Sequence, residues 1–337
     1  MYSNEDIESA VVAQAISPQA AQALRDHVDN MRKTSAVDEE SFRLLAGFND
    51  IFVVIASLLL LGATFVLGGA YHRWLGGLLC AGVAWGLAEY FVRKRHMALP
   101  AVVLLLAFIV AIGSVPIYGY GIKDAVIRWI IAILLTALAA LLHWRRFHIP
   151  ITLAAGVGVV VWGVLSVFLM VFPVLENMMP KLIFGSGLLV FAFAMYWDVS
   201  DIQRQTRRAD VAFWLHLLAA PMLVHPLFIT MLGEGDVRLL NTLLVLIFYV
   251  LMAFFSLAID RRALMVSALG YVLYAFTSLL DKSGFVSLSF AITALIAGSA
   301  LLLLSAFWHQ SRGFVLGLLP LSVCRYFPRC YPGRAGL

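Results

Sequence analysis

The sequence predicts an all-α protein, a polytopic transmembrane helical bundle of about ten spans with both termini in the cytoplasm. Of its 337 residues, 62% are hydrophobic and 13% are charged, whereas a soluble domain has about a half and a quarter. The apolar residues come in runs of roughly 18 to 23, the length that a helix needs to cross a hydrocarbon core about 30 Å thick. If the chain crosses the membrane in this way, most of the Lys and Arg residues fall on one side of the membrane.

Residues 1–49 are polar, and we expect them to form a cytoplasmic helical N-terminal region. A short helix is predicted over residues 4–15. Ser17 and Pro18 predict the start of a second helix, because serine caps helices and proline fits the first helical position. A third segment is predicted to begin near Asp38 and to lead into the membrane. The region is too small for its own core and lacks the apolar stretch of a cleavable signal peptide.

Residues 50–309 are predicted to form the ten-span bundle. Proline placement agrees, because Pro100, Pro150 and Pro180 lie at predicted helix starts, and only Pro221 and Pro226 lie inside a span. The predicted spans are residues 50–70, 75–92, 98–117, 124–143, 150–172, 180–197, 212–232, 239–260, 263–280 and 287–309.

The orientation follows from the basic residues. Eighteen of the 24 Lys and Arg residues fall in the N-terminal region, the turns after even-numbered spans, and residues 310–337, which we interpret as a basic cytoplasmic tail. Cytoplasmic loops carry such an excess. The net charge of +5 is therefore explained by topology and lipid headgroups. We expect the lipid bilayer as a partner and no nucleic acid.

A weak repeat runs through the predicted cytoplasmic turns. Arg93–His96 before Pro100 is similar to Arg145–His148 before Pro150. Duplication of a two-helix hairpin would produce this pattern. We favour the simpler interpretation that orientation selects basic turns.

The seventh span holds the candidate transport or structural polar site, which consists of His216, Pro221, His225 and Pro226. Two prolines predict a broken helix, and buried imidazoles need polar partners, as in many transport sites. The alternative is a kinked structural helix whose histidines bond to neighbours. Nine residues place His216 and His225 about 13 Å apart on opposite faces of a straight helix, so they are not expected to share a metal.

Four acidic residues are predicted near the cytoplasmic ends of spans: Asp50, Glu89, Asp198 and Asp260. We expect an ion pair between Glu89 and Arg93, which are four residues apart on one helix. Asp50 is expected to cap the first span. Asp260 is expected to lie in the headgroup region.

No catalytic, cofactor-binding or metal-binding residues are predicted, and we expect that the protein is not an enzyme. The motifs of nucleotide-binding loops, zinc proteases and serine hydrolases are missing, and the three cysteines have no metal-ligand spacing. His143, His148 and His216 lie on one predicted side of the membrane, but no haem attachment pattern accompanies them.

Gly82 and Gly86 form a GxxxG motif in the second span. Small residues let helices approach closely, so packing within the chain is the default expectation. The sharper alternative is a homo-oligomer or a membrane-protein partner.

The stretch Phe42–Phe52, the seventh span, and Asp260-Arg261-Arg262 before Val266–Tyr271 resemble an uncharacterised family of bacterial predicted polytopic membrane proteins, a domain of unknown function. These proteins have a short helical N-terminal region followed by multiple spans. The resemblance covers most of the chain and implies the cell inner membrane, but it implies no site residues. The tail from Ser322 to Leu337, rich in Arg, Tyr, Cys and Gly, departs from it.

Two classes of function remain. A non-enzymatic membrane scaffold or accessory protein is favoured, because charge is scarce near the predicted mid-membrane region. The alternative is a small-solute or lipid transporter that uses the broken seventh span.

Overall fold

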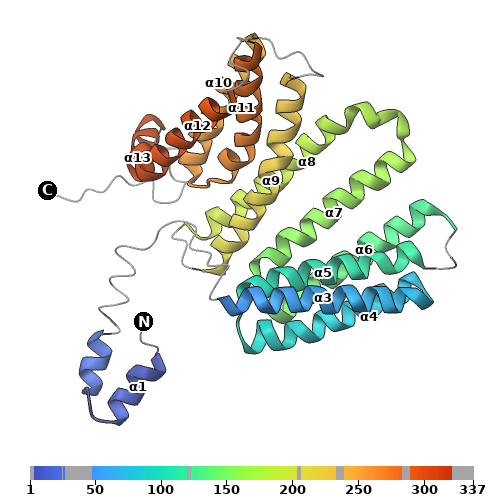
Figure 1. Ribbon diagram of the computed structural model, residues 1–337, viewed down its shortest axis with the longest axis vertical. Helices are drawn as coiled ribbons and strands as arrows, with labels where there is room; N and C mark the ends of the chain where they lie inside the picture. Colours follow the sequence, from blue (N-terminus) through green and yellow to red (C-terminus); the bar gives the residue numbers. More distant parts are fainter. Residues whose placement is uncertain are drawn as a thin grey trace. The chain divides into compact units, whose positions relative to one another are not determined.

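The computed structural model describes residues 4–24, 26, 48–119, 121, 123–202, 206–232, 239–282 and 289–320. The chain divides into two compact units, Met1–Ser41 and Phe42–Leu337. Throughout the described ranges every regular element is a helix, so the predicted all-α class is confirmed (Figure 1).

The smaller unit contains α1 (Asn4–Val12) and a second helical segment at residues 18–24. The amide of Ala20 donates a hydrogen bond of 3.1 Å to Ser17 Oγ. The predicted serine cap, with Pro18 as the first helical residue, is thus confirmed. The third segment predicted near Asp38 lies outside the described residues.

The larger unit has a helix at each of the ten predicted span positions. Short connections separate these helices where proline and basic residues predict them. The apolar runs and the proline and basic residues between them therefore identify the helices. The helices are α3 (Phe48–Tyr71), α4 (Arg73–Ala88), α5 (Ala98–Tyr118), α6 (Ala125–Phe147), α7 (Pro150–Val171), α8 (Met179–Ser200), α9 (Arg207–Leu232), α10 (Leu239–Ile259), α11 (Ala263–Lys282) and α12 (Ser289–Ala306).

Seven of the helical stretches among the described residues are long and apolar enough to cross a membrane. Two of them include short helices of other types: the π-helix η1 (Glu89–Lys94) continues α4, and the 3-10 helix η2 (Pro173–Met178) precedes α8. The apolar described parts of α10 and α11 are shorter, at Leu243–Ile259 and Ala263–Thr277. The protein is therefore a helical protein with several helices suited to a bilayer.

The end of the last predicted span differs from the expectation. α12 stops at Ala306, and α13 (Trp308–Leu318) continues after a bend of 78°. The segment predicted as tail thus begins with a helix. Trp308 is buried at its start, rather than placed among lipid headgroups as tryptophans at span ends usually are.

The predicted break in the seventh span is wrong, because α9 is one helix that runs through both Pro221 and Pro226. A proline removes only its own N–H from the backbone ladder, and packing against neighbouring helices can hold the rest of the helix together. Half of the apolar stretch of α9 is buried, a larger share than in the other six candidate spans. α9 contacts α7, α8, α10 and α11.

Glycines set the closest helix contacts. A Cβ on Gly76 would lie 2.4 Å from the carbonyl oxygen of Phe65, and one on Gly77 would lie 2.2 Å from Ser114 Oγ. These glycines let α3 and α5 approach α4 closely. Gly82 and Gly86 have no atom within 4 Å of such a Cβ. The default expectation that the GxxxG motif packs within the chain is therefore wrong.

Three helix connections contain a residue with a left-handed backbone conformation. His96, His148 and Asp260 have φ angles of 53°, 53° and 62°, in the left-handed region. A left-handed residue after the last helical turn ends a helix and redirects the chain. The two histidines occupy equivalent positions in the repeated basic turns, so the sequence similarity extends to the backbone.

Candidate functional site: a buried ionic cluster

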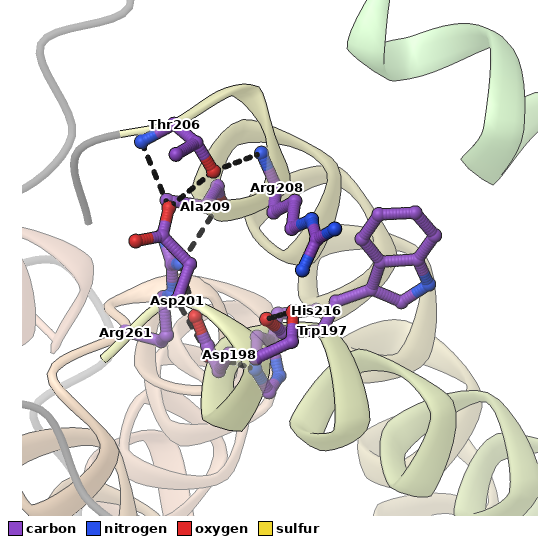
Figure 2. Close-up of polar contacts among 9 residues, drawn as sticks. Trp197, Asp198, Asp201, Thr206, Arg208, Ala209, His216 and Arg261 are labelled. Carbon is purple, nitrogen blue, oxygen red and sulfur yellow. Dashed lines mark hydrogen bonds and ion pairs between the residues drawn. The ribbon is translucent and has the colours of Figure 1, made fainter. Parts of the chain in front are cut away.

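Three buried ionisable residues of the larger unit contact one another: Asp198, His216 and Arg261, which we call the Asp198 cluster. Asp198 lies near the end of α8, His216 lies in α9, and Arg261 lies in the turn between α10 and α11 (Figure 2). Their side chains are 1%, 2% and 3% exposed. The cluster thus joins three parts of the chain away from solvent and lipid.

Both oxygens of the Asp198 carboxylate are engaged. Arg261 donates from Nη2 to Asp198 Oδ1 at 2.6 Å and from Nε to Oδ2 at 3.4 Å. His216 Nε2 lies 2.8 Å from Oδ2. Arg261 Nη2 also donates to the carbonyl oxygen of Ala209 at 3.0 Å. A fork of this kind fixes the direction of the guanidinium as well as its position.

A second carboxylate, Asp201, links the end of α8 to the residue that precedes α9. Asp201 Oδ2 accepts hydrogen bonds from the amide and the hydroxyl of Thr206, at 2.8 and 2.7 Å. Thr206 Oγ1 in turn accepts from the amide of Arg208 at 3.2 Å, which caps the first turn of α9 (Figure 2). These bonds link the end of α8, which carries Asp198, to the start of α9, which carries His216.

The turn that carries Arg261 is held by Ser256 in α10. The amide of Arg261 donates to the carbonyl oxygen of Ser256 at 2.9 Å, and the hydroxyl of Ser256 donates back to the carbonyl oxygen of Arg261. Asp260, in the left-handed conformation, lies between them. The paired bonds present the guanidinium of Arg261 toward α8.

A second group, which we call the Asp260 cluster, lies beside the same turn. Trp308 Nε1 donates to Asp260 Oδ1 at 2.9 Å, and Arg312 Nε lies 3.6 Å from the same oxygen. The guanidinium of Arg262 lies 4.7 Å from the centre of the Trp308 ring. Asp260 is 6% exposed, so its carboxylate is enclosed by protein groups. The indole donor and Arg312 compensate its burial.

Asp260, Arg261 and Arg262 therefore point toward two different groups of partners. Asp260 and Arg262 reach α13, whereas Arg261 reaches α8 and the carbonyl of Ala209 in α9. The tripeptide connects the α10–α11 turn to three other helices.

The four residues of the predicted polar site do not form one site. His216 is buried with Asp198, whereas His225 is exposed and its Nδ1 bonds to the hydroxyl of Tyr271 in α11. Pro221 and Pro226 lie within the continuous helix. In the described part of the chain, no group of three or more His, Cys, Asp or Glu residues has the arrangement of a metal site.

The predicted ion pair of Glu89 and Arg93 is confirmed, at 3.2 Å. Glu89 has a second partner that the sequence did not predict. Arg146 of α6 donates to both oxygens of Glu89, at 2.6 and 3.1 Å. We call these three residues the Glu89 cluster. Glu89 and Arg93 lie in η1, and π-helical turns occur often at functional positions.

His143 is enclosed by aromatic rings rather than placed beside another histidine. Trp85, Phe108 and Phe147 have ring centres within 5.8 Å of its own. Its Nδ1 lies 3.4 Å from Thr152 Oγ1. His143 and His216 thus have separate partners, and the structure does not place them as a pair.

Thr152 also borders an apolar cavity of about 370 Å³ between α6, α7 and α8. Trp144 lies at the α6 end of its lining, and Gly156 leaves room for it in α7. The remaining lining residues are Ala137, Ala140, Leu141, Leu153, Val157, Val160, Val161 and Phe193. Apart from the threonine hydroxyl and the indole N–H, the side chains present only carbon and suit an apolar ligand.

The cluster that sequence analysis missed depends on Asp198 and Arg261, which are 63 residues apart. One signal was present: both are charged residues at span ends that the charge pattern places on the same side of the membrane. Opposite charges at equal depth are candidates for pairing. Comparisons of the chain with protein-family models, curated proteins and solved structures find no match.

Proposed function

We propose that the protein is a ten-span integral protein of the cell inner membrane, with both termini cytoplasmic, that acts without catalysis as a lipid-binding scaffold or accessory protein. The cavity between α6, α7 and α8 is the observation that carries this proposal. The charged clusters agree with a scaffold, because both oxygens of the buried Asp198 carboxylate are already engaged by Arg261 and His216.

The mouth of the cavity indicates the kind of ligand. Leu141, Val160 and Phe193 line it and are also exposed, so the cavity opens on an apolar outer surface of three candidate spans. In a bilayer that surface faces hydrocarbon. An acyl chain of a membrane lipid is therefore the fitting occupant.

The end of the cavity near Trp144 suits a headgroup. Tryptophan favours the membrane interface, and the exposed Arg145 follows Trp144 at the end of α6. A cation at this level attracts anionic lipids. We therefore assign an anionic phospholipid to the site, with its chain in the cavity and its phosphate near Arg145.

Lipid retention tests this assignment. Val160→Phe fills the cavity, and Val164→Phe is the matched control, one turn further along α7, exposed and outside the lining. Native mass spectrometry of protein extracted with mild detergent should show a bound anionic phospholipid in the wild type and the control, and its loss in Val160→Phe. Equal lipid in both variants would refute the site.

The ten-span topology has its own test. Reporter fusions at Lys123, Lys181 and Lys282 should all report the side opposite the cytoplasm, because these residues lie at the span ends that the charge pattern places on the side with few cations. A cytoplasmic signal at any of the three would break the topology.

Transport is the second candidate, and one observation favours it. Asp198 and His216 are ionisable residues buried within candidate spans, and such residues often mark ion or substrate pathways. A deletion strain compared with its parent by metabolite and lipid profiling separates the two functions. One accumulated solute, reproduced by a His225→Ala variant of normal abundance, would favour transport. A change only in a partner's abundance would favour the accessory function.

A further inference from the structure

A second cavity lies between α10, α11 and α12, in a part of the larger unit that the ionic clusters and the lipid cavity do not include. Its volume is about 190 Å³. Most of its lining is aliphatic, with Met265 and Phe276 from α11 as its sulfur and phenyl groups. Tyr249 of α10 and Thr293 of α12 are its hydroxyl-bearing residues.

Thr293 is the unusual member of this lining. It is 2% exposed, and its Oγ1 has no hydrogen-bond partner. A threonine in a helix usually bonds to the carbonyl four residues earlier. Thr64 and Thr230 do so in this protein, with bonds of 2.7 Å to the carbonyl oxygens of Leu60 and Pro226. A buried hydroxyl without a partner is costly, so a ligand that pairs with it gains affinity.

The size of the cavity limits the ligand. A dry apolar cavity of about 150 Å³ in another protein holds one benzene ring. A volume of about 190 Å³ therefore admits one ring with a small substituent. Aromatic and thioether groups, such as those of Phe276 and Met265, pack favourably against the faces and edges of a ring.

The cavity is reached from the outer surface of the helices. Ile296 belongs to the lining and is 52% exposed. It lies in α12, one of the apolar helices. A ligand that partitions into the bilayer can enter at this position, whereas a charged solute would find no charged side chain in the lining to offset its desolvation.

We propose that this cavity binds a single aromatic or quinonoid ring that presents a hydrogen-bonding oxygen to Thr293, such as a phenol or a quinone head group. The ring packs against the cavity-lining side chains of α11, and its oxygen bonds to Thr293 Oγ1. The hydroxyl of threonine can donate to a carbonyl or accept from a phenol. This site is independent of the lipid cavity, which is lined by other helices.

Phenol and toluene test the proposal, because they have nearly the same shape and differ in the hydroxyl group. Binding to the full-length protein in nanodiscs is measured by saturation-transfer NMR, with empty nanodiscs subtracted. The wild type should bind phenol roughly three- to tenfold more tightly than Thr293→Val does, the value of one hydrogen bond. Toluene should bind both proteins equally. Thr64→Val, which removes a hydroxyl that bonds within its own helix, should leave phenol binding unchanged.

A cavity-filling variant and a second probe complete the test. Ala300→Phe should abolish binding of both phenol and toluene, while the unfolding temperature shows whether the protein still folds. Benzaldehyde offers only an acceptor: sensitivity of its binding to Thr293→Val would favour a quinone, and sensitivity of phenol alone would favour a phenol. Phenol binding that is equal in the wild type and Thr293→Val would overturn the site.

Discussion

The Asp198 cluster and the Glu89 cluster use the same chemistry in different surroundings. Each has a carboxylate near the end of a candidate span and an arginine from another part of the chain, with a shortest N–O distance of 2.6 Å in both. The side chains of Asp198 and Arg261 are 1% and 3% exposed, whereas those of Glu89 and Arg146 are 29% and 43% exposed. The two ion pairs thus have the same shortest N–O distance but differ in burial.

The difference teaches that burial decides what an ion pair does. Exposed pairs gain little, because solvent screens them and the side chains lose freedom. A buried pair has a large desolvation cost that its partners must offset, so removing one partner leaves an uncompensated charge. The Asp198 cluster should therefore control whether α8, α9 and α11 pack, and the Glu89 cluster should not control packing.

The largest expected effect is that of Arg261→Met. It leaves the Asp198 carboxylate buried with only His216 as a partner, a loss of about 3–5 kcal/mol in the free energy of unfolding. Denaturant unfolding in detergent micelles measures it. Arg93→Met removes a cation from the exposed cluster and is the control. Equal losses in the two variants would contradict the effect of burial.

A smaller loss is expected for His216→Leu. Arg261 still engages both oxygens of Asp198 in this variant, so only the histidine bond is lost, about 1–3 kcal/mol. His225→Leu is the matched control on the same helix, because His225 is exposed. A larger loss of stability in His225→Leu than in His216→Leu would contradict the greater contribution expected of the buried histidine.

A local effect is expected for Trp308→Phe. The variant keeps the ring over which Arg262 lies but removes the donor to Asp260, at a cost of about 1 kcal/mol. Because the bond joins α13 to the α10–α11 turn, hydrogen exchange should rise in α13 and stay unchanged in α3–α6. Uniform exchange across the chain would show that the bond does not anchor α13.

The smallest effect is expected for Glu89→Gln. Its side chain keeps hydrogen-bonding capacity at an exposed position, so the thermal unfolding midpoint should not change measurably. The same measurement at low and high salt should give the same small difference. A clear drop in the midpoint at low salt would show that this exposed cluster contributes to packing.

Local features were predictable from the sequence, because neighbouring residues encode them. Apolar runs and prolines located the helices, Ser17 and Pro18 located a helix start, and the spacing of Glu89 and Arg93 located an ion pair. These signals depend on neighbouring residues or on one helical turn.

The features that could not be predicted depend on how helices rotate against one another. Pairing of Asp198 with Arg261, and of Glu89 with Arg146, requires the azimuth of each helix. Helices that are apolar all around hide this angle, because lipid-facing and buried sides have similar composition. The continuity of α9 through two prolines likewise depends on its neighbours, which local propensity does not include.

A double-mutant cycle on Asp198 and Arg261 tests the central claim most directly. The free energy of unfolding is measured for the wild type, Asp198→Asn, Arg261→Met and the double variant. Because each single change leaves a buried group without its partner, the account predicts that the double variant is more stable than additivity allows by at least about 1.5 kcal/mol. Additive losses would contradict it.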